Sequence, residues 1–262
     1  MRRTFLLILF FLSGISGLIY EIAWVRQASL TFGVSIYAYS AVLTAYMAGM
    51  ALGSYRLGRR IDHSDRPLRT YAILEIGIAC LAVLSPLALT SLNGLYAAIT
   101  RALHPGLGLL TLLRLVLSIL TLVPPTFLIG ATLPVMSRIY AARSGQVGGD
   151  LGRLYVANTA GAVLGCLLTG VFLIRLLGLR EAIFLGAALN LLVAGGALWL
   201  ERTGQPASTT QTAPVSEPPA RRRGRHHPLP SAHELSPSAL RYVAAGYAIS
   251  GFVALGYEVA WA

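Results

Sequence analysis

The chain has 262 residues, of which 55% are apolar and only 12% are charged, and its mean hydropathy is +0.67. This composition excludes an ordinary soluble domain and is typical of a protein with several membrane-spanning helices. The formal net charge is +11, and all 21 basic residues are Arg because the chain contains no Lys. The Arg residues lie between apolar segments, which indicates membrane topology and not a nucleic-acid partner.

The first apolar segment, residues 4–25, contains the sequence Ser13-Gly-Ile-Ser-Gly-Leu-Ile-Tyr-Glu-Ile-Ala-Trp24. Its basic start, apolar run and small residues resemble a secretory signal. The same pattern returns at the end of the chain as Ser250-Gly-Phe-Val-Ala-Leu-Gly-Tyr-Glu-Val-Ala-Trp261, where it is internal and is not a signal peptide. We therefore predict that residues 4–25 form the first membrane span.

Each copy of this repeat places one carboxylate in an apolar helix. Helical spacing puts Tyr20 and Trp24 on one face with Glu21 at its edge. The second copy supplies the equivalent set Tyr257, Glu258 and Trp261. Because an ionisable residue inside a span predicts a functional site, both sets are candidate substrate or proton sites. Packing explains them equally well, with aromatic residues in the interfacial belt and Glu paired to Arg.

Two pairs of Gly residues predict close contacts between helices. The second span, residues 34–55, contains Gly49 and Gly53, and the fifth span, residues 154–177, contains Gly161 and Gly165. Gly residues four apart let a neighbouring helix approach, and helix packing is all that this spacing supports.

The third span is predicted at residues 71–92, followed by a loop at residues 93–106. Glu75 falls in the first turn of this span, so we expect it to be solvated near the membrane interface.

The fourth span is predicted at residues 107–129, with a kinked continuation to residue 140. Three residues are expected to break its regular hydrogen bonding: Pro124, Pro125 and Pro134. Arg114 lies about 10 Å inside this span and Glu21 about 7 Å inside the first span from the same side, at 1.5 Å per residue. An ion pair between these residues would explain both charges structurally, and Arg26 is a second candidate partner.

The remainder of the chain contains two further spans, a linker and the start of a second repeat. Residues 145–152 are rich in Gly but follow an apolar helix, so they predict a flexible turn and not a phosphate loop. A very short turn at residues 178–180 joins the fifth span to the sixth, residues 181–200. Residues 201–239 hold seven of the 13 Pro residues and predict a disordered linker with a solvated Arg cluster. Residues 240–262 are the first, incomplete helix of a second repeat.

The distribution of Arg predicts the orientation in the membrane. Sixteen of the 21 Arg residues fall on one side of the predicted spans and four on the other. The Arg-rich side, with the N-terminus and the linker, is therefore expected to be cytoplasmic in the cell (inner) membrane. Six spans followed by a restart in the same orientation predict a parallel repeat. We expect an all-α, polytopic membrane protein whose residues 1–200 form a six-helix bundle similar to one half of a major facilitator.

Three motifs in order give the chain a family resemblance. They are Ser13-Gly-x5-Tyr-Glu-x-Ala-Trp-x-Arg26, Pro125-Thr-Phe-Leu-Ile-Gly-Ala-Thr-Leu-Pro134 and Leu154-Tyr-Val-Ala-Asn-Thr-Ala-Gly-Ala-Val-Leu-Gly165. Together they resemble the membrane part of the fused transporter–spermidine synthase proteins, in which a region similar to a major facilitator is joined to a cytoplasmic aminopropyltransferase-like domain. The resemblance covers all seven predicted spans. It implies a missing second membrane half, a missing soluble domain, and a polyamine or other cationic small molecule as ligand.

The chain departs from this family where catalysis would reside. It has no strand followed by G-x-G-x-x-G and no acidic cluster, so we expect no catalytic site, cofactor or metal site in this chain. It also ends one residue after Trp261, whereas the first copy of the repeat continues to Arg26, and we infer a fragment or a shortened gene product. Two functions remain: a module that binds or moves a cationic solute at Glu21 and Glu258, or a purely structural membrane anchor. An enzyme contained within these residues ranks last.

Overall fold

The computed structural model describes residues 2–33, 35–61, 65–104, 106–141 and 147–203, together with short stretches between residues 241 and 256. The chain divides into two compact units, Met1–Gly204 and Gln205–Ala262. In the second unit the described residues are helical. The second copy of the repeat, with Tyr257, Glu258 and Trp261, lies outside the described residues, as does most of the predicted linker.

The first unit is a bundle of long helices. They are α1 (Arg2–Phe32), α2 (Ile36–Ile61), α3 (Pro67–Leu103), α4 (Leu107–Ala141), α5 (Val147–Leu168) and α7 (Leu179–Thr203). A π-helical turn, Thr169–Leu173, and the short α6, Ile174–Leu176, connect α5 to α7. Six helical segments are long and apolar enough to cross a membrane, and the described residues contain no strand. The prediction of an all-α bundle with six spans is therefore confirmed.

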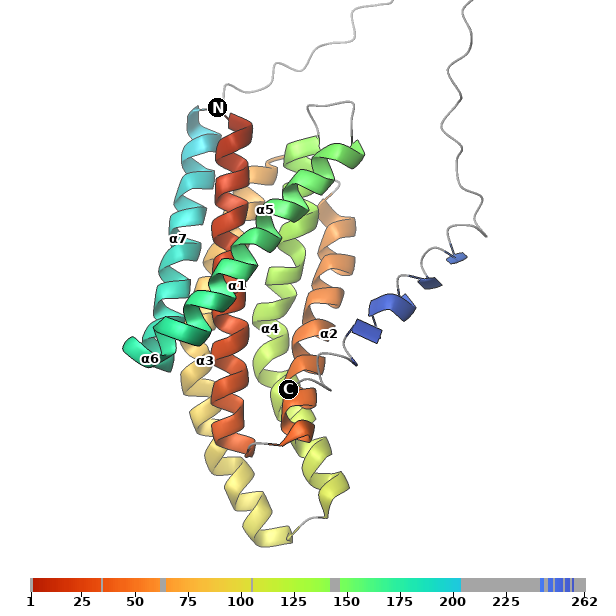
Figure 1. The fold of residues 1–262 in the computed structure, drawn as a ribbon, viewed down its shortest axis with the longest axis vertical. Helices are drawn as coiled ribbons and strands as arrows, with labels where there is room; N and C mark the ends of the chain where they lie inside the picture. Colours follow the sequence, from red (N-terminus) through yellow and green to blue (C-terminus); the bar gives the residue numbers. More distant parts are fainter. Residues whose placement is uncertain are drawn as a thin grey trace, which may run out of the picture. The chain divides into compact units, whose positions relative to one another are not determined.

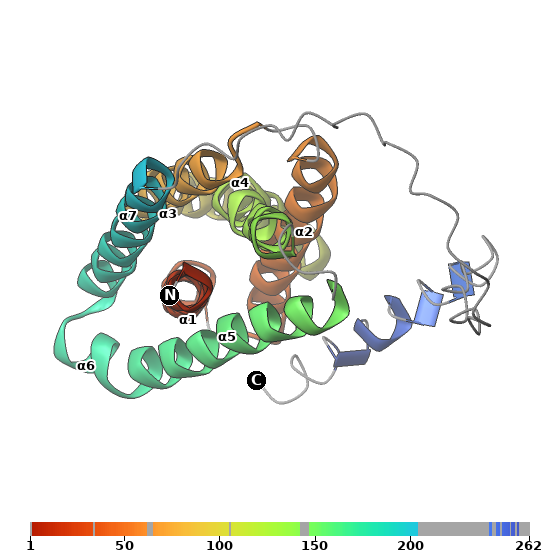
Figure 2. The ribbon, with the colours of Figure 1, turned by 90° about the horizontal axis from the view of Figure 1, so that it is seen from above.

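The helices stand side by side with α1 inside the bundle. Viewed along the helix axes, α1 lies within an arc formed by α7, α3, α4, α2 and α5 (Figure 2). The most extensive packing joins α2 to α4, α1 to α5, and α3 to α7. The start of α1, the end of α2, the start of α3, the end of α4 and the end of α7 lie at one end of the bundle (Figure 1). We call this the N-terminal end.

The Gly residues of the sequence pairs lie where helices approach closely. A Cβ atom added at Gly53 would stand 1.8 Å from the Phe127 carbonyl oxygen on α4, and one added at Gly49 would stand 1.8 Å from Thr126. On α5, Gly161 faces the backbone of Phe11, and Gly165 similarly faces Ile15 on α1. These contacts hold α2 on α4 and α1 on α5 at distances that a larger residue would prevent.

Helix α3 is longer than the sequence indicated. The loop expected at residues 93–106 is wrong, because α3 continues to Leu103 and ends where His104 adopts a left-handed backbone with φ 40°. Within the expected loop, the ring of Tyr96 meets Phe32 of α1 edge-on at 5.2 Å between centroids. At 37 residues, α3 is about 55 Å long and exceeds a hydrocarbon core of about 30 Å.

One further expectation about local structure agrees with the structure and another needs correction. Helix α4 continues past residue 129 to Ala141, with Pro124, Pro125 and Pro134 inside it, and a kink at these residues stays a prediction. The hydroxyls of Thr121 and Thr126 donate to the carbonyls one turn before them, at 3.0 and 2.7 Å. The turn expected at residues 145–152 is wrong for residues 147–152, because α5 begins at Val147 and includes the last three Gly residues of that segment, while residues 145 and 146 lie outside the described residues.

Candidate functional site

A carboxyl group lies in the core of the bundle. Glu75 of α3 is 0% exposed, so the expectation of a solvated position at the interface is wrong. The error came from the predicted start of the span: α3 begins at Pro67, which places Glu75 about 12 Å along the helix. The residue that the sequence placed at the edge of the membrane is therefore enclosed by protein.

Side chains from two other helices bind this carboxyl group. Ser13 Oγ of α1 donates to Glu75 Oε1 at 2.7 Å, and Asn190 Nδ2 of α7 donates to Glu75 Oε2. The hydroxyl of Tyr20, also on α1, donates to Asn190 Oδ1 at 2.7 Å. This chain of hydrogen bonds links α1, α3 and α7 in the middle of the bundle.

Tyr71 adds a second polar group on the same face of α3. It precedes Glu75 by one helical turn and is 0% exposed. Its hydroxyl lies beside Glu75 and Ser13 but completes no hydrogen bond of normal geometry. We call Ser13, Tyr20, Tyr71, Glu75 and Asn190 the Glu75 cluster.

The Glu75 cluster contains no basic side chain. Among the described residues, the groups that act on Glu75 are Ser13, Asn190 and Tyr71, and none of them is basic. An ionised carboxylate enclosed in a low dielectric without a cation is costly. The cluster is therefore built for a neutral carboxyl group or for one that meets a cation from outside.

An aromatic layer lies next to the Glu75 cluster. Tyr20 stacks on Trp24 with 5.3 Å between ring centroids, and Trp24 Nε1 donates to Ser85 Oγ of α3 at 2.7 Å. Both aromatic residues are 0% exposed, so they do not form an interfacial belt. Gly186 of α7 lies against the Tyr20 ring, where an added Cβ would stand 2.7 Å from Cε1. Tyr20 thus belongs at once to the aromatic layer and to the hydrogen-bond chain.

The acid singled out by the sequence repeat has a different environment. Glu21 is half-buried and lies beside Tyr46, whose hydroxyl donates to the Gly17 carbonyl at 3.3 Å. Arg114 of α4 donates from Nε to the Tyr96 hydroxyl at 3.2 Å. Arg26 is exposed. Pairing of Glu21 with Arg114 or Arg26 stays a prediction.

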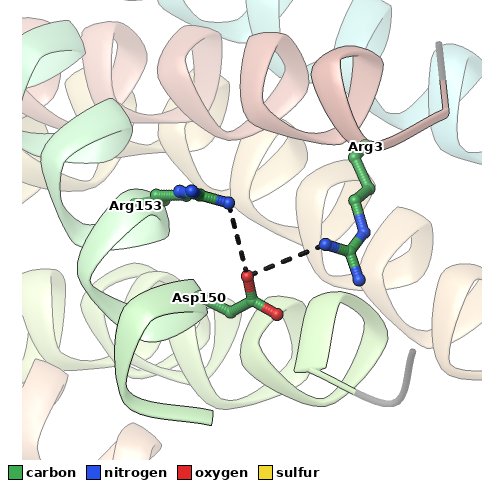
Figure 3. Close-up of polar contacts among 3 residues, drawn as sticks. All are labelled: Arg3, Asp150 and Arg153. Carbon is green, nitrogen blue, oxygen red and sulfur yellow. Dashed lines mark ion pairs between the residues drawn. The ribbon is translucent and has the colours of Figure 1, made fainter. Parts of the chain in front are cut away.

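A second polar group of residues lies at the N-terminal end of the bundle. Asp150 of α5 is 3% exposed, and its Oδ1 lies 3.9 Å from Arg3 Nη1 of α1 and 3.8 Å from Arg153 Nη1 (Figure 3). The Arg3 guanidinium also stands over the Tyr140 ring of α4, 5.5 Å from its centroid. These contacts tie α1, α4 and α5 together at this end.

The fold and the Glu75 cluster define a multi-pass helical membrane protein with a polar centre. Comparison of the chain with protein families, curated proteins and solved structures finds no match. Within the described part of the chain, no group of three His, Cys, Asp or Glu side chains could hold a metal ion.

The sequence alone could have identified Glu75 as a candidate site residue, although the repeated motif pointed to Glu21 instead. Glu75 stands alone as a charged residue in the apolar run from residue 70 to residue 100. The same rule that singled out Glu21 applies to it. Its partners carried no comparable signal, because Asn190 lies 115 residues further along the chain.

Proposed function

We propose that the chain forms a membrane module that binds and moves a small cationic solute, and that the Glu75 cluster is the polar centre on which this movement depends. The observation that carries the proposal is an enclosed carboxyl group that forms no ion pair with a basic side chain of the described residues. Charged groups inside membranes are costly, and they mark ion, proton or substrate pathways. A module that only holds another domain at the membrane needs no such group.

The family resemblance supplies the first solute to test. Spermidine is a polycation, and an enclosed carboxyl group attracts a cation strongly in a low dielectric. The proposal includes the wider arrangement expected from the sequence: a second membrane half, a cytoplasmic aminopropyltransferase-like domain, and an N-terminus and linker that face the cytoplasm of the inner membrane.

The test is uptake of radiolabelled spermidine into proteoliposomes that contain the full chain. Glu75→Gln keeps the shape of the side chain and removes its charge. Losing a hydrogen bond to a charged group is worth about 1.5–3 kcal/mol, so we expect uptake to fall by at least about tenfold. The matched control is Glu181→Gln, an exposed acid in the first turn of α7, which should leave uptake unchanged. Equal uptake by wild type and Glu75→Gln contradicts the proposal.

A structural anchor is the second candidate. It is favoured by one observation: both oxygens of Glu75 already accept hydrogen bonds from neighbouring helices. In that case the Glu75 cluster only fixes how α1, α3 and α7 pack. Wild-type proteoliposomes would then take up no spermidine, and Glu75→Gln would change the unfolding midpoint alone.

A further inference from the structure

We propose that Glu75 binds a proton, which is held between its carboxyl group and the hydroxyl of Tyr71, while Ser13 and Asn190 fix the orientation of the carboxyl group. The inference rests on the proposed function, for which it names the coupling ion. It also makes a claim about the resting protein that is measurable without any transport.

The balance of donors and acceptors in the Glu75 cluster carries the argument. Both carboxyl oxygens accept hydrogen bonds, one from Ser13 and one from Asn190. The Asn190 amide is oriented for this role, because its oxygen accepts from Tyr20 and its nitrogen is left to donate. Beside the carboxyl group lies the buried hydroxyl of Tyr71, which is close enough to act on Glu75 but lies outside the geometry of a hydrogen bond. A Tyr hydroxyl can donate or accept, so its oxygen can accept from a proton carried by Glu75.

The charges around Glu75 favour the protonated form. Four sets of side chains surround it, one from each helix packed against α3 and one from α3 itself. On α1 the titratable neighbour is Tyr20, and on α3 it is Tyr71. Helix α7 contributes the neutral Asn190, and α4 contributes Ala131 and Val135 to the same core. Among the described residues none of these contacting groups is a cation and no ion pair to Glu75 is formed, so an ionised Glu75 would have no counter-charge in direct contact.

In the closed bundle a proton fits this site better than a metal ion. A metal ion needs several oxygen ligands, and among the described residues Glu75 is the only acid in the cluster. The Asn190 nitrogen, a donor, already occupies one side of the carboxyl group. Release of the proton requires water to reach Glu75. The carboxyl O–H bond then breaks heterolytically, and the proton passes to water.

Infrared spectroscopy of the purified full chain in lipid nanodiscs tests the inference. A protonated carboxylic acid shows a carbonyl stretch that a carboxylate lacks and that shifts in heavy water. We expect this band at neutral pH in wild type, moved by ¹³C-labelled Glu and absent in Glu75→Gln. Tyr71→Phe should shift the band because its hydrogen-bond partner is gone. The control Glu181→Gln should leave it unchanged.

Several results would overturn the inference. A wild-type spectrum without the band shows an ionised Glu75, and a band that survives in Glu75→Gln belongs to another acid. A band that disappears on addition of sodium ions assigns the site to a metal cation. If Glu75→Gln does not purify as a single species, Glu75→Asp replaces it: the ¹³C-Glu shift must then vanish. If Glu75→Gln loses spermidine uptake but the wild-type spectrum lacks the band, only the proposal of a bound proton is rejected. If the wild-type spectrum shows the band but wild type takes up no spermidine, only the proposed transport is rejected.

Discussion

At the scale of single residues, Asn190 holds the Glu75 cluster together. It accepts from Tyr20 and donates to Glu75, and it is 1% exposed. Replacing it with an apolar residue of similar size leaves the Tyr20 hydroxyl and Glu75 Oε2 buried without this hydrogen-bond partner. Each such group costs about 1–3 kcal/mol, so we expect Asn190→Leu to lower the midpoint of thermal unfolding in detergent clearly. The control is Ser118→Ala, since Ser118 Oγ is buried with no hydrogen bond, and its removal should be neutral or stabilising.

Ser85 offers an independent residue-scale prediction. Its hydroxyl accepts from the Trp24 indole and donates to the Ala82 carbonyl. Ser85→Ala leaves the buried indole N–H without an acceptor, which should cost about 1–3 kcal/mol of stability. Ser91→Ala removes a hydroxyl from an exposed position of the same helix and should change little. Equal unfolding midpoints for the two variants would show that the indole bond contributes nothing.

The sequence predicted contacts within one helix but not the contacts between helices. Helical spacing correctly put Tyr20 and Trp24 on one face of α1, because that relation is local. Their partners, Asn190 and Ser85, lie 170 and 61 residues away, and no local pattern joins them. The sequence repeat singled out Glu21 as the candidate site. Glu75, however, is fully buried, and its depth in the bundle could not be predicted without knowing where α3 begins.

At the scale of helices, close packing of α1 on α5 depends on Gly161. A Cβ added there would stand 2.0 Å from the Phe11 carbonyl oxygen, which is backbone and has little freedom to move. We expect Gly161→Ala to force the two helices apart and to lower the unfolding midpoint. Gly152→Ala, on the same helix with nothing within 4 Å, is the matched control and should raise stability slightly, since Ala favours helix by about 1 kcal/mol. A Gly161→Ala variant as stable as Gly152→Ala would contradict this packing.

The ion pairs of Asp150 give a second prediction at this scale. Arg3 links α1 to α5 and also stands over Tyr140, whereas the Arg153 side chain lies on the same helix as Asp150 and is 68% exposed. Exposed pairs contribute about 0–1 kcal/mol, so Arg153→Gln should hardly change the unfolding midpoint. Arg3→Gln loses contacts to two helices and should lower it more. The reverse order would show that the ties between helices at this end lie elsewhere.

The helices themselves were largely predictable, and their ends were not. Six apolar runs separated by Arg-rich segments predicted the spans because the hydrocarbon core demands about 20 apolar residues for each. A loop was expected at residues 93–106, but Tyr96 packs on Phe32 and α3 continues to Leu103. The continuation of the fourth span through its three Pro residues was expected, and α4 runs to Ala141. At Tyr96 a contact between helices accompanies the part of α3 that the sequence did not predict.

At the scale of the whole membrane region, the bundle has two ends that differ in charge. The ends of α2, α4 and α7 and the starts of α1, α3 and α5 carry ten of the 16 described Arg residues, and all lie at the N-terminal end of the bundle (Figure 1). The opposite end, where α3 meets α4, holds few. Because Lys and Arg near short loops are retained on the cytoplasmic side, this asymmetry predicts that the N-terminal end faces the cytoplasm.

Reporter fusions in a bacterial host test this orientation. Alkaline phosphatase needs disulfides, which form in the periplasm and not in the cytosol, whereas a fluorescent protein reports the cytosolic side. A fusion after Thr203, at the end of α7, should be fluorescent and show no phosphatase activity. A fusion after His104, at the end of α3, should show the opposite because α3 crosses the membrane once from the N-terminal end. The inverse pattern at both positions would place the Arg-rich end outside, and Glu75, about 12 Å along α3 from that end, would then lie nearer the periplasmic face.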